Sequence, residues 1–215
     1  MKIRNIIFCG ALIFMATGSA SQDQNESFLT IAPLMESRHS GREYDNTKLV
    51  TADQIKALSE AARLAPSCYN DQPWFFILCD RTTQPEAYKK VMNCLVEFNQ
   101  GWAKNAPLLV VVLADSKFEK SQKLNRWGSY DTGAAAFSMA LQAAHMGLMA
   151  HQMGGFDEDK IRKEFSIPSS VTPMAIMAIG YEQAGAQVPL KDRRPLTDNF
   201  FLGAWGGKSA GSTTQ

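Results

Sequence analysis

Residues 51–79 read TADQIKALSEAARLAPSCYNDQPWFFILC and predict a helix, a loop and a strand in succession. Thr51 and Gln54 have the spacing of a capping box, in which both side chains bond backbone N–H groups at the start of a helix. Apolar side chains then recur at helical spacing until Pro66, which ends the helix. The apolar run Trp74–Cys79 follows between turn residues, and it predicts a short buried strand.

The rest of the chain mixes helices and strands in the same way. The patterns predict further helices over 85–103, 130–148 and 157–165, and further buried strands over 108–114 and 174–179. The helix over 130–148 is apolar or small on nearly all sides, as expected of a helix that is packed closely on several sides. Because no regular strand–helix–strand alternation with a glycine-rich first turn is present, the order favours an α+β fold over a doubly wound one.

Composition and charge exclude several classes of protein. The chain has 215 residues, which suits one domain with appendages, and 45% of them are apolar, which suits a sizeable core. Its 22 basic and 21 acidic residues leave a net charge of +1, so no basic excess points to a nucleic-acid partner. The cysteines form no CxxC pair and the three histidines are scattered, which gives zinc or thioredoxin-like chemistry little support.

The first 20 residues, MKIRNIIFCGALIFMATGSA, predict a signal peptide or a membrane anchor. Lys2 and Arg4 precede an apolar run, and Gly18 and Ala20 stand where a cleavage site has its small residues. A buried N-terminal helix or strand is the alternative. We therefore expect the domain to be exported, either to the periplasm or out of the cell, or to be anchored to the membrane. An anchored domain could also lie on the cytoplasmic face.

The regions that flank the predicted domain are polar or rich in small residues. Residues 21–34 begin with SQDQNES and predict a polar spacer and lead-in. Residues 203–215, GAWGGKSAGSTTQ, predict a flexible tail rich in glycine and serine. A single domain over residues 35–202 remains between them.

Four polar segments could bind a ligand, and each also has an ordinary explanation. Residues 38–42, RHSGR, offer two guanidinium groups, a hydroxyl and an imidazole to a phosphate and a polyol, or they form a solvated basic turn. Residues 66–74, PSCYNDQPW, hold hydroxyl and amide groups between prolines, or they form a turn. Residues 152–157, QMGGFD, let a ligand approach the backbone, or they only precede a helix. Residues 191–196, KDRRPL, form a late phosphate site or a surface charge run.

Taken together in this order, the segments resemble the nitroreductase family of FMN-dependent oxidoreductases over about Met35 to Phe200. The motifs that carry the resemblance are Arg-His-Ser-x-Arg, Ala-Pro-Ser-x-x-Asn-x-Gln-Pro-Trp, Asp131-Thr-Gly with the helix end Ala-Ala-His-x-Gly-Leu148, Gly-Gly-Phe-Asp, Ala-Ile-Gly-Tyr181 and Arg193-Arg-Pro-Leu. The resemblance implies a three-layer α+β fold with a central, mainly antiparallel sheet flanked by helices. It also implies a homodimer with two FMN sites at the interface.

The resemblance further implies which residues contact FMN. The phosphate and ribityl chain would be held by Arg38, His39, Ser40 and Arg42, with Arg38 also near the pyrimidine edge. FMN bound mainly by the partner subunit would be contacted by Pro66, Ser67, Asn70 and Gln72. The backbone facing flavin N5 would be that of Met153, Gly154 and Gly155, although some relatives have Glu at the position of Gly154. Late phosphate ligands would be Lys191 and Arg193, with Arg194 as an alternative.

In such a protein the flavin carries the redox chemistry, so we expect no catalytic residue and no metal site. The resemblance implies that hydride passes from NAD(P)H or another donor to the flavin, and then to a nitroaromatic, a quinone or a similar acceptor, by a ping-pong mechanism. Reductive dehalogenases and flavin-binding or flavin-remodelling proteins of the same fold are the alternatives. The polar segment 116–127 is the expected lid, and it does not reveal a substrate. An exported domain would meet little NAD(P)H, which leaves the donor open.

Overall fold

The computed structural model describes residues 31–187 and 191–209. The predicted leader over residues 1–20 lies outside the described residues, as do most of the spacer over 21–34 and the last part of the predicted tail. The contacts within the chain define a unit that begins at Leu34. Within the described residues, no helix combines the length and apolar character needed to cross a membrane.

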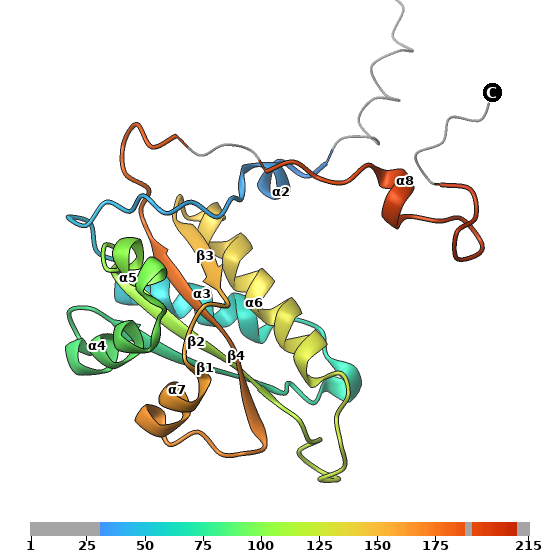
Figure 1. The fold of residues 1–215 in the computed structure, drawn as a ribbon, viewed down its shortest axis with the longest axis horizontal. Coiled ribbons are helices and arrows are strands. Elements are labelled where there is room, and N and C mark those ends of the chain that lie inside the picture. Colours follow the sequence, from blue (N-terminus) through green and yellow to red (C-terminus); the bar gives the residue numbers. More distant parts are fainter. Residues whose placement is uncertain (1–30, 188–190, 210–215) are drawn as a thin grey trace, which may run out of the picture. The chain divides into compact units, whose positions relative to one another are not determined.

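The centre of the fold is an antiparallel sheet with the strand order β1-β2-β4-β3 (Figure 1). Its strands are β1 (Trp74–Asp80), β2 (Leu108–Asp115), β3 (Met149–Met153) and β4 (Val171–Gly180). The three predicted strands are confirmed. The sequence patterns missed β3, because its five residues include polar His151 and Gln152 and therefore lack the continuous apolar run of the other strands.

Helices cover both faces of this sheet. Strand β2 sends alternate side chains to opposite faces, and all but its last residue are buried, as expected of a strand covered on both sides. Helices α3 (Ala52–Arg63) and α6 (Gly128–His145) pack on one face. Helices α4 (Pro85–Cys94), α5 (Glu97–Ala103) and α7 (Glu158–Phe165) pack on the other face. The expected three-layer α+β architecture is thus confirmed.

The helix predicted over 85–103 is wrong as a single element, since the chain forms α4 and α5 with a break between them. Leu95 and Val96 at the break have extended backbone, with ψ of 148° and 151°. Leu95 is buried and pairs with Phe156, and the Val96 N–H donates to the Gly155 carbonyl at 3.1 Å. This pairing with a distant segment replaces the helical hydrogen bonds, and local periodicity does not reveal it.

Helix α6 ends three residues earlier than predicted. Its end is a Schellman motif, in which Gly147 has a φ of 70° and the N–H groups of Gly147 and Leu148 bond the carbonyls of Ala144 and Ala143. The chain can then turn directly into β3. At the start of α3, by contrast, the predicted capping box of Thr51 and Gln54 is confirmed.

The segment after α2 (Pro33–Ser37) is fastened to the end of strand β4. Tyr44 pairs with Glu182, and the buried Tyr44 hydroxyl donates to the Ala178 carbonyl at 2.9 Å. The Gln183 N–H also donates to the Glu43 carbonyl at 2.9 Å. The first candidate ligand-binding segment is thereby placed beside the sheet.

Candidate functional site

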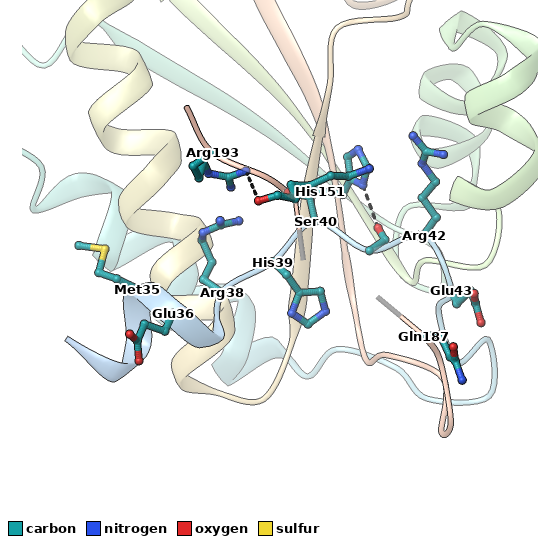
Figure 2. Close-up of a pocket in the computed structure, with 12 residues that line it drawn as sticks. Met35, Glu36, Arg38, His39, Ser40, Arg42, Glu43, His151, Gln187 and Arg193 are labelled. Carbon is teal, nitrogen blue, oxygen red and sulfur yellow. Dashed lines mark hydrogen bonds between the residues drawn. The ribbon is translucent and has the colours of Figure 1, made fainter. Parts of the chain in front are cut away.

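A cavity of about 520 Å³ joins residues from both ends of the described chain (Figure 2). Six of the predicted FMN contacts line it, and they are Arg38, His39, Ser40, Arg42, Lys191 and Arg193. The sequence patterns missed the other side chains that line it, which are Met35, Glu36, Glu43, His151 and Gln187. The cavity therefore brings together the first and the last of the four candidate segments.

Cations outnumber carboxylates in the wall of this cavity. The wall contains four arginine and lysine side chains and only two carboxylates, those of Glu36 and Glu43, and all of the cations are donors only. Among the described residues, the Arg38 guanidinium makes no hydrogen bond or ion pair, while Arg193 donates to the Lys191 carbonyl at 3.1 Å. Guanidinium groups match the oxygen geometry of a phosphate, so the wall suits an anionic ligand.

Arg42 extends from the cavity toward α5 (Figure 2). Its guanidinium lies 4.9 Å from the ring centre of Phe98, a side chain that is 64% exposed. A cation over an aromatic face is attracted by the ring's charge distribution. Phe98 therefore holds this arginine at one side of the cavity.

Both ring nitrogens of His39 are bonded within the chain. Nδ1 lies 3.0 Å from the Ser37 carbonyl oxygen, and Nε2 lies 2.9 Å from Oε1 of Glu182. Both partners only accept, so the two hydrogen bonds form together when both nitrogens carry a proton. Both ring nitrogens therefore already have partners within the chain, while His39 still lines the cavity, and its contact with FMN stays a prediction.

The second candidate segment, residues 66–72, lies away from the cavity. The Cys68 N–H donates to the carboxylate of Asp131 at 3.0 Å, and Asp131 is a buried residue in the first turn of α6. A smaller cavity of about 180 Å³ instead joins Arg38 to Ala144, near the other end of α6. Asp131 and Ala144 are 13 residues apart, which is about 20 Å of helix.

Several polar groups of this loop bond within the loop. Oγ of Ser67 accepts from the Gln72 N–H at 3.0 Å, and the Gln72 amide donates to the Asn70 carbonyl at 3.2 Å. Tyr69, Asn70 and Gln72 have φ of 56°, 56° and 52°, in the left-handed region that non-glycine residues rarely adopt. Pro66 and Asn70 are exposed. Such backbone strain persists only when the surrounding bonds determine it.

The expected lid packs on this loop. Within segment 116–127, the ring of Phe118 lies 6.1 Å from that of Tyr69 and 6.4 Å from that of Trp127. Asp71 accepts from the Glu119 N–H at 3.2 Å and from the Asn125 amide at 3.3 Å. The lid and the loop therefore form one surface at the start of α6, separate from the cavity.

The third candidate segment follows β3 and offers backbone to a ligand. The side chain of Met153 is in the core and 3% exposed, whereas a Cβ at Gly154 would meet no atom within 4 Å. A Cβ at Gly155 would lie 2.9 Å from side-chain atoms of Val96 and Asn99, so any larger residue would force these side chains at the start of α5 to shift. Only backbone is available here, as the predicted role requires.

His151 was noted in the sequence only as one of three scattered histidines, because β3 was not predicted. Its Nδ1 lies 2.8 Å from the Gly41 carbonyl oxygen (Figure 2). Its ring lies 4.7 Å from that of Trp102. Burial is the main cause that lowers the pKa of His151, and the positive charges of Arg42 and Lys191 lower it further. Hydrogen bonds to the Gly41 and Ser40 backbone oppose this shift. An uncharged imidazole therefore lines a cavity rich in cations.

Comparison with known proteins gives consistent matches. The model of the nitroreductase family matches residues 35–181. A proposed NADH dehydrogenase/NAD(P)H nitroreductase of Archaeoglobus fulgidus is 30% identical over 173 residues, which cover 78% of this chain and 94% of that protein. An oxygen-insensitive NADPH nitroreductase of Helicobacter pylori is 33% identical over 79 residues, or 37% of this chain and 36% of that protein.

Solved structures agree with these relatives. The crystal structure of an oxidoreductase containing FMN has a TM-score of 0.75 and 33% identity, over 83% of this chain and 94% of that chain. A nitroreductase family protein of Clostridium difficile has a TM-score of 0.67 and 26% identity, over 82% of this chain and 99% of that chain. Since the family model covers well over half of the sequence and the antiparallel three-layer fold agrees with it, this chain belongs to the nitroreductase family.

Proposed function

We propose that this protein is an FMN-dependent oxidoreductase whose cavity holds the cofactor phosphate between Arg38, Arg42, Lys191 and Arg193. One observation carries the proposal: cations from the two ends of the domain line a single cavity in a nitroreductase fold. The similarity to an oxidoreductase containing FMN, at 33% identity, supports it.

The residues present fit this cofactor. The cations supply the charge and the donors that a phosphate requires, and the Ser40 hydroxyl can bond either a phosphate or a polyol. The cavity volume of about 520 Å³ lies in the range usual for cofactor sites. Gly154 lies three residues after His151, which is about 10 Å of extended chain from a residue of the cavity wall. A Cβ at Gly154 would meet no atom within 4 Å, so there is room for a flat ring beside its backbone.

The chemistry that FMN supplies when bound is hydride transfer at its ring. The arginines and Lys191 of the cavity would hold FMN by offsetting its phosphate charge, and the backbone at Gly154 and Gly155 would border its ring. We assign no side chain as nucleophile or proton donor. The pair of His39 and Glu182 fixes the segment that carries the arginines.

We infer that the donor is NAD(P)H and that the acceptors are nitroaromatics, quinones or similar compounds reduced in turn at one site by a ping-pong mechanism. Support comes from relatives proposed as NADH dehydrogenases or NAD(P)H nitroreductases. Initial rates at several concentrations of both substrates test this. Parallel lines in double-reciprocal plots are expected, and intersecting lines would contradict an alternating mechanism.

We further propose that the protein is a homodimer in which segment 66–72 completes the FMN site of the partner subunit. About 20 Å of α6 separate this loop from Ala144 in the smaller cavity, which Arg38 also lines. This separation supports the proposal, since one chain does not bring both groups of predicted contacts together. Exposed apolar side chains near the loop and on the C-terminal segment support it too. Among them are Tyr69, Leu124, Tyr130, Phe200 and Trp205.

We also propose that the N-terminal segment exports or anchors the domain and takes no part in FMN binding. The apolar run and the small residues at 18 and 20 support it. A chain that begins at Ser21 should be soluble, yellow and as active as the full chain. Loss of FMN from the shortened chain alone would assign the leader a structural role.

The direct test of the cofactor is a visible spectrum of the purified protein, followed by flavin titration of variants. Arg38→Ala should weaken FMN binding by about 10- to 150-fold, because a charged hydrogen bond contributes about 1.5–3 kcal/mol. Arg194 is exposed and outside the cavity wall, so Arg194→Ala is the matched control, with a loss below about 1 kcal/mol. A colourless protein that binds no added FMN would overturn the proposed function, and equal losses would overturn the role of Arg38.

A further inference from the structure

His151 occupies a fixed position in the cavity wall that none of the ligand-binding motifs includes. It lies on β3, and its ring is held between the Gly41 carbonyl and the ring of Trp102. Trp102 in turn stacks on Tyr44, with ring centres 6.2 Å apart. Since aromatic rings pack on one side and a hydrogen bond fixes the edge, the imidazole has little freedom to rotate.

The hydrogen bond to Gly41 determines which nitrogen carries the proton. A carbonyl oxygen accepts, so Nδ1 at 2.8 Å must be the donor. In an uncharged imidazole the other nitrogen, Nε2, then has a lone pair and no proton. Among the described residues, the Gly41 carbonyl is the main hydrogen-bond partner of this ring; the Ser40 backbone also interacts with the ring, more weakly, and raises its pKa. The direction of the pKa shift agrees with an uncharged ring, since burial and the neighbouring cations both lower the pKa of His151.

A lone pair at this position selects the kind of group that it can bind. The cationic side chains around it only donate, and they will be occupied by an anion. The carboxylates of Glu36 and Glu43 also accept, but both residues are exposed, whereas His151 is half-buried. An uncharged donor that lies next to the anion in the same ligand fits Nε2, because it leaves the cationic side chains to the anion. In a flavin mononucleotide, the groups next to the phosphate are the hydroxyls of the sugar-alcohol chain.

We propose that Nε2 of His151 accepts a hydrogen bond from a hydroxyl of the ribityl chain, and that this residue favours flavins that carry the chain. The inference rests on the proposed function. It adds a cofactor-contacting residue and a reason for preferring one class of flavin. Lumiflavin lacks the chain, riboflavin has the chain without the phosphate, and FMN has both, so the three ligands separate the two contributions.

Titration of the flavin-free protein with these three flavins tests the inference. His151→Phe keeps a ring against Trp102 and lacks the acceptor. This variant should weaken the binding of riboflavin and FMN by about 2- to 12-fold, the equivalent of one neutral hydrogen bond, and leave the binding of lumiflavin unchanged. His151→Gln places an amide oxygen near the position of Nε2, so it should restore most of the loss. The exposed His145 is the control, and His145→Gln should change none of the affinities.

Nitrogen NMR of the wild-type protein gives a second measurement that does not depend on a folded variant. Nε2 of His151 should have the resonance of an unprotonated nitrogen in the flavin-free protein. Riboflavin should shift this resonance, and lumiflavin should not. A proton on Nε2 in the flavin-free protein, or a resonance that riboflavin leaves in place, would overturn the inference.

The two proposals fail in different ways. A wild-type protein that binds none of the three flavins would overturn both the proposed function and the role of His151. The role of His151 alone would be overturned if the wild-type protein binds FMN tightly and His151→Phe weakens the binding of all three flavins equally, or of none.

Discussion

Gly154 and Gly155 are neighbours on the chain, yet the structure predicts opposite responses to a methyl group. Gly155→Ala would bring a Cβ within 2.9 Å of Val96 and Asn99, so we expect a loss of about 1–3 kcal/mol in the free energy of unfolding, as for other overpacked sites. Gly154→Ala meets no atom within 4 Å and is the matched control, expected to change stability by less than about 0.5 kcal/mol. Urea unfolding of both variants measures this, and equal losses would contradict the packing argument.

A second prediction at the scale of one residue concerns the pH dependence of stability. The folded state lowers the pKa of His151 below its ordinary 6.5, mainly through burial. The unfolded chain therefore binds more protons as the pH falls, and the contribution of His151 is complete above about pH 6.5 and is lost as the pH falls through the folded-state pKa.

The test compares wild type with His151→Gln, which cannot titrate. The free energy of unfolding of the wild type should fall more between about pH 7.5 and pH 5 than that of the variant. All other titrating groups are common to both proteins, so the difference reports His151. Identical pH profiles would mean that the pKa of His151 is unchanged by folding.

At the scale of elements, the loop at the start of α6 shows how tertiary bonds hold a strained backbone. Tyr69 has a φ of 56° and is 90% exposed, so its side chain contributes little packing. We expect Tyr69→Gly to be more stable than Tyr69→Ala by about 1 kcal/mol, because glycine adopts the left-handed region without steric cost. The order of stability should reverse at exposed Lys56 within α3. There, Lys56→Ala should have a free energy of unfolding about 1 kcal/mol higher than Lys56→Gly. Denaturant unfolding of the four variants decides this, and an unreversed order would exclude strain at Tyr69.

The element boundaries differ in whether local or long-range interactions determine them. The capping box at Thr51 was predictable because both of its residues lie within one turn. The break at Leu95 was not, since it depends on pairing with Phe156. Strand β3 was missed for a similar reason: its hydrogen bonds to β4 define it, while its own side chains include His151 and Gln152.

At the scale of the whole molecule, the proposed site requires two chains. We expect sedimentation equilibrium and size-exclusion chromatography to give a dimer, and dilution below the dimer dissociation constant to release FMN together with the subunits. The physical reason is that about 20 Å of α6 separate segment 66–72 from Ala144 in the smaller cavity, which Arg38 also lines. A monomer that retains one FMN per chain would contradict the shared site.

The sequence by itself determined the parts that depend on local pattern. Apolar runs and helical periodicity predicted three strands and the helices α3, α6 and α7, and the order of the elements predicted the α+β class. The motifs predicted that Arg38 and Arg193 belong to one site, and the cavity contains both. The sequence also singled out Gly154 and Gly155, whose surroundings explain why only backbone is available there.

Only the tertiary structure decided which groups remain available to a ligand. His39 and Ser67 looked equivalent to Arg38 as candidate contacts, yet both use their side-chain polar atoms within the chain, His39 toward Glu182 and Ser67 toward Gln72. His151 gave no signal in the sequence and lines the cavity. The physical reason is that a hydrogen bond satisfies a donor or acceptor through partners that folding brings from distant positions, whereas periodicity reports only which face of an element is apolar.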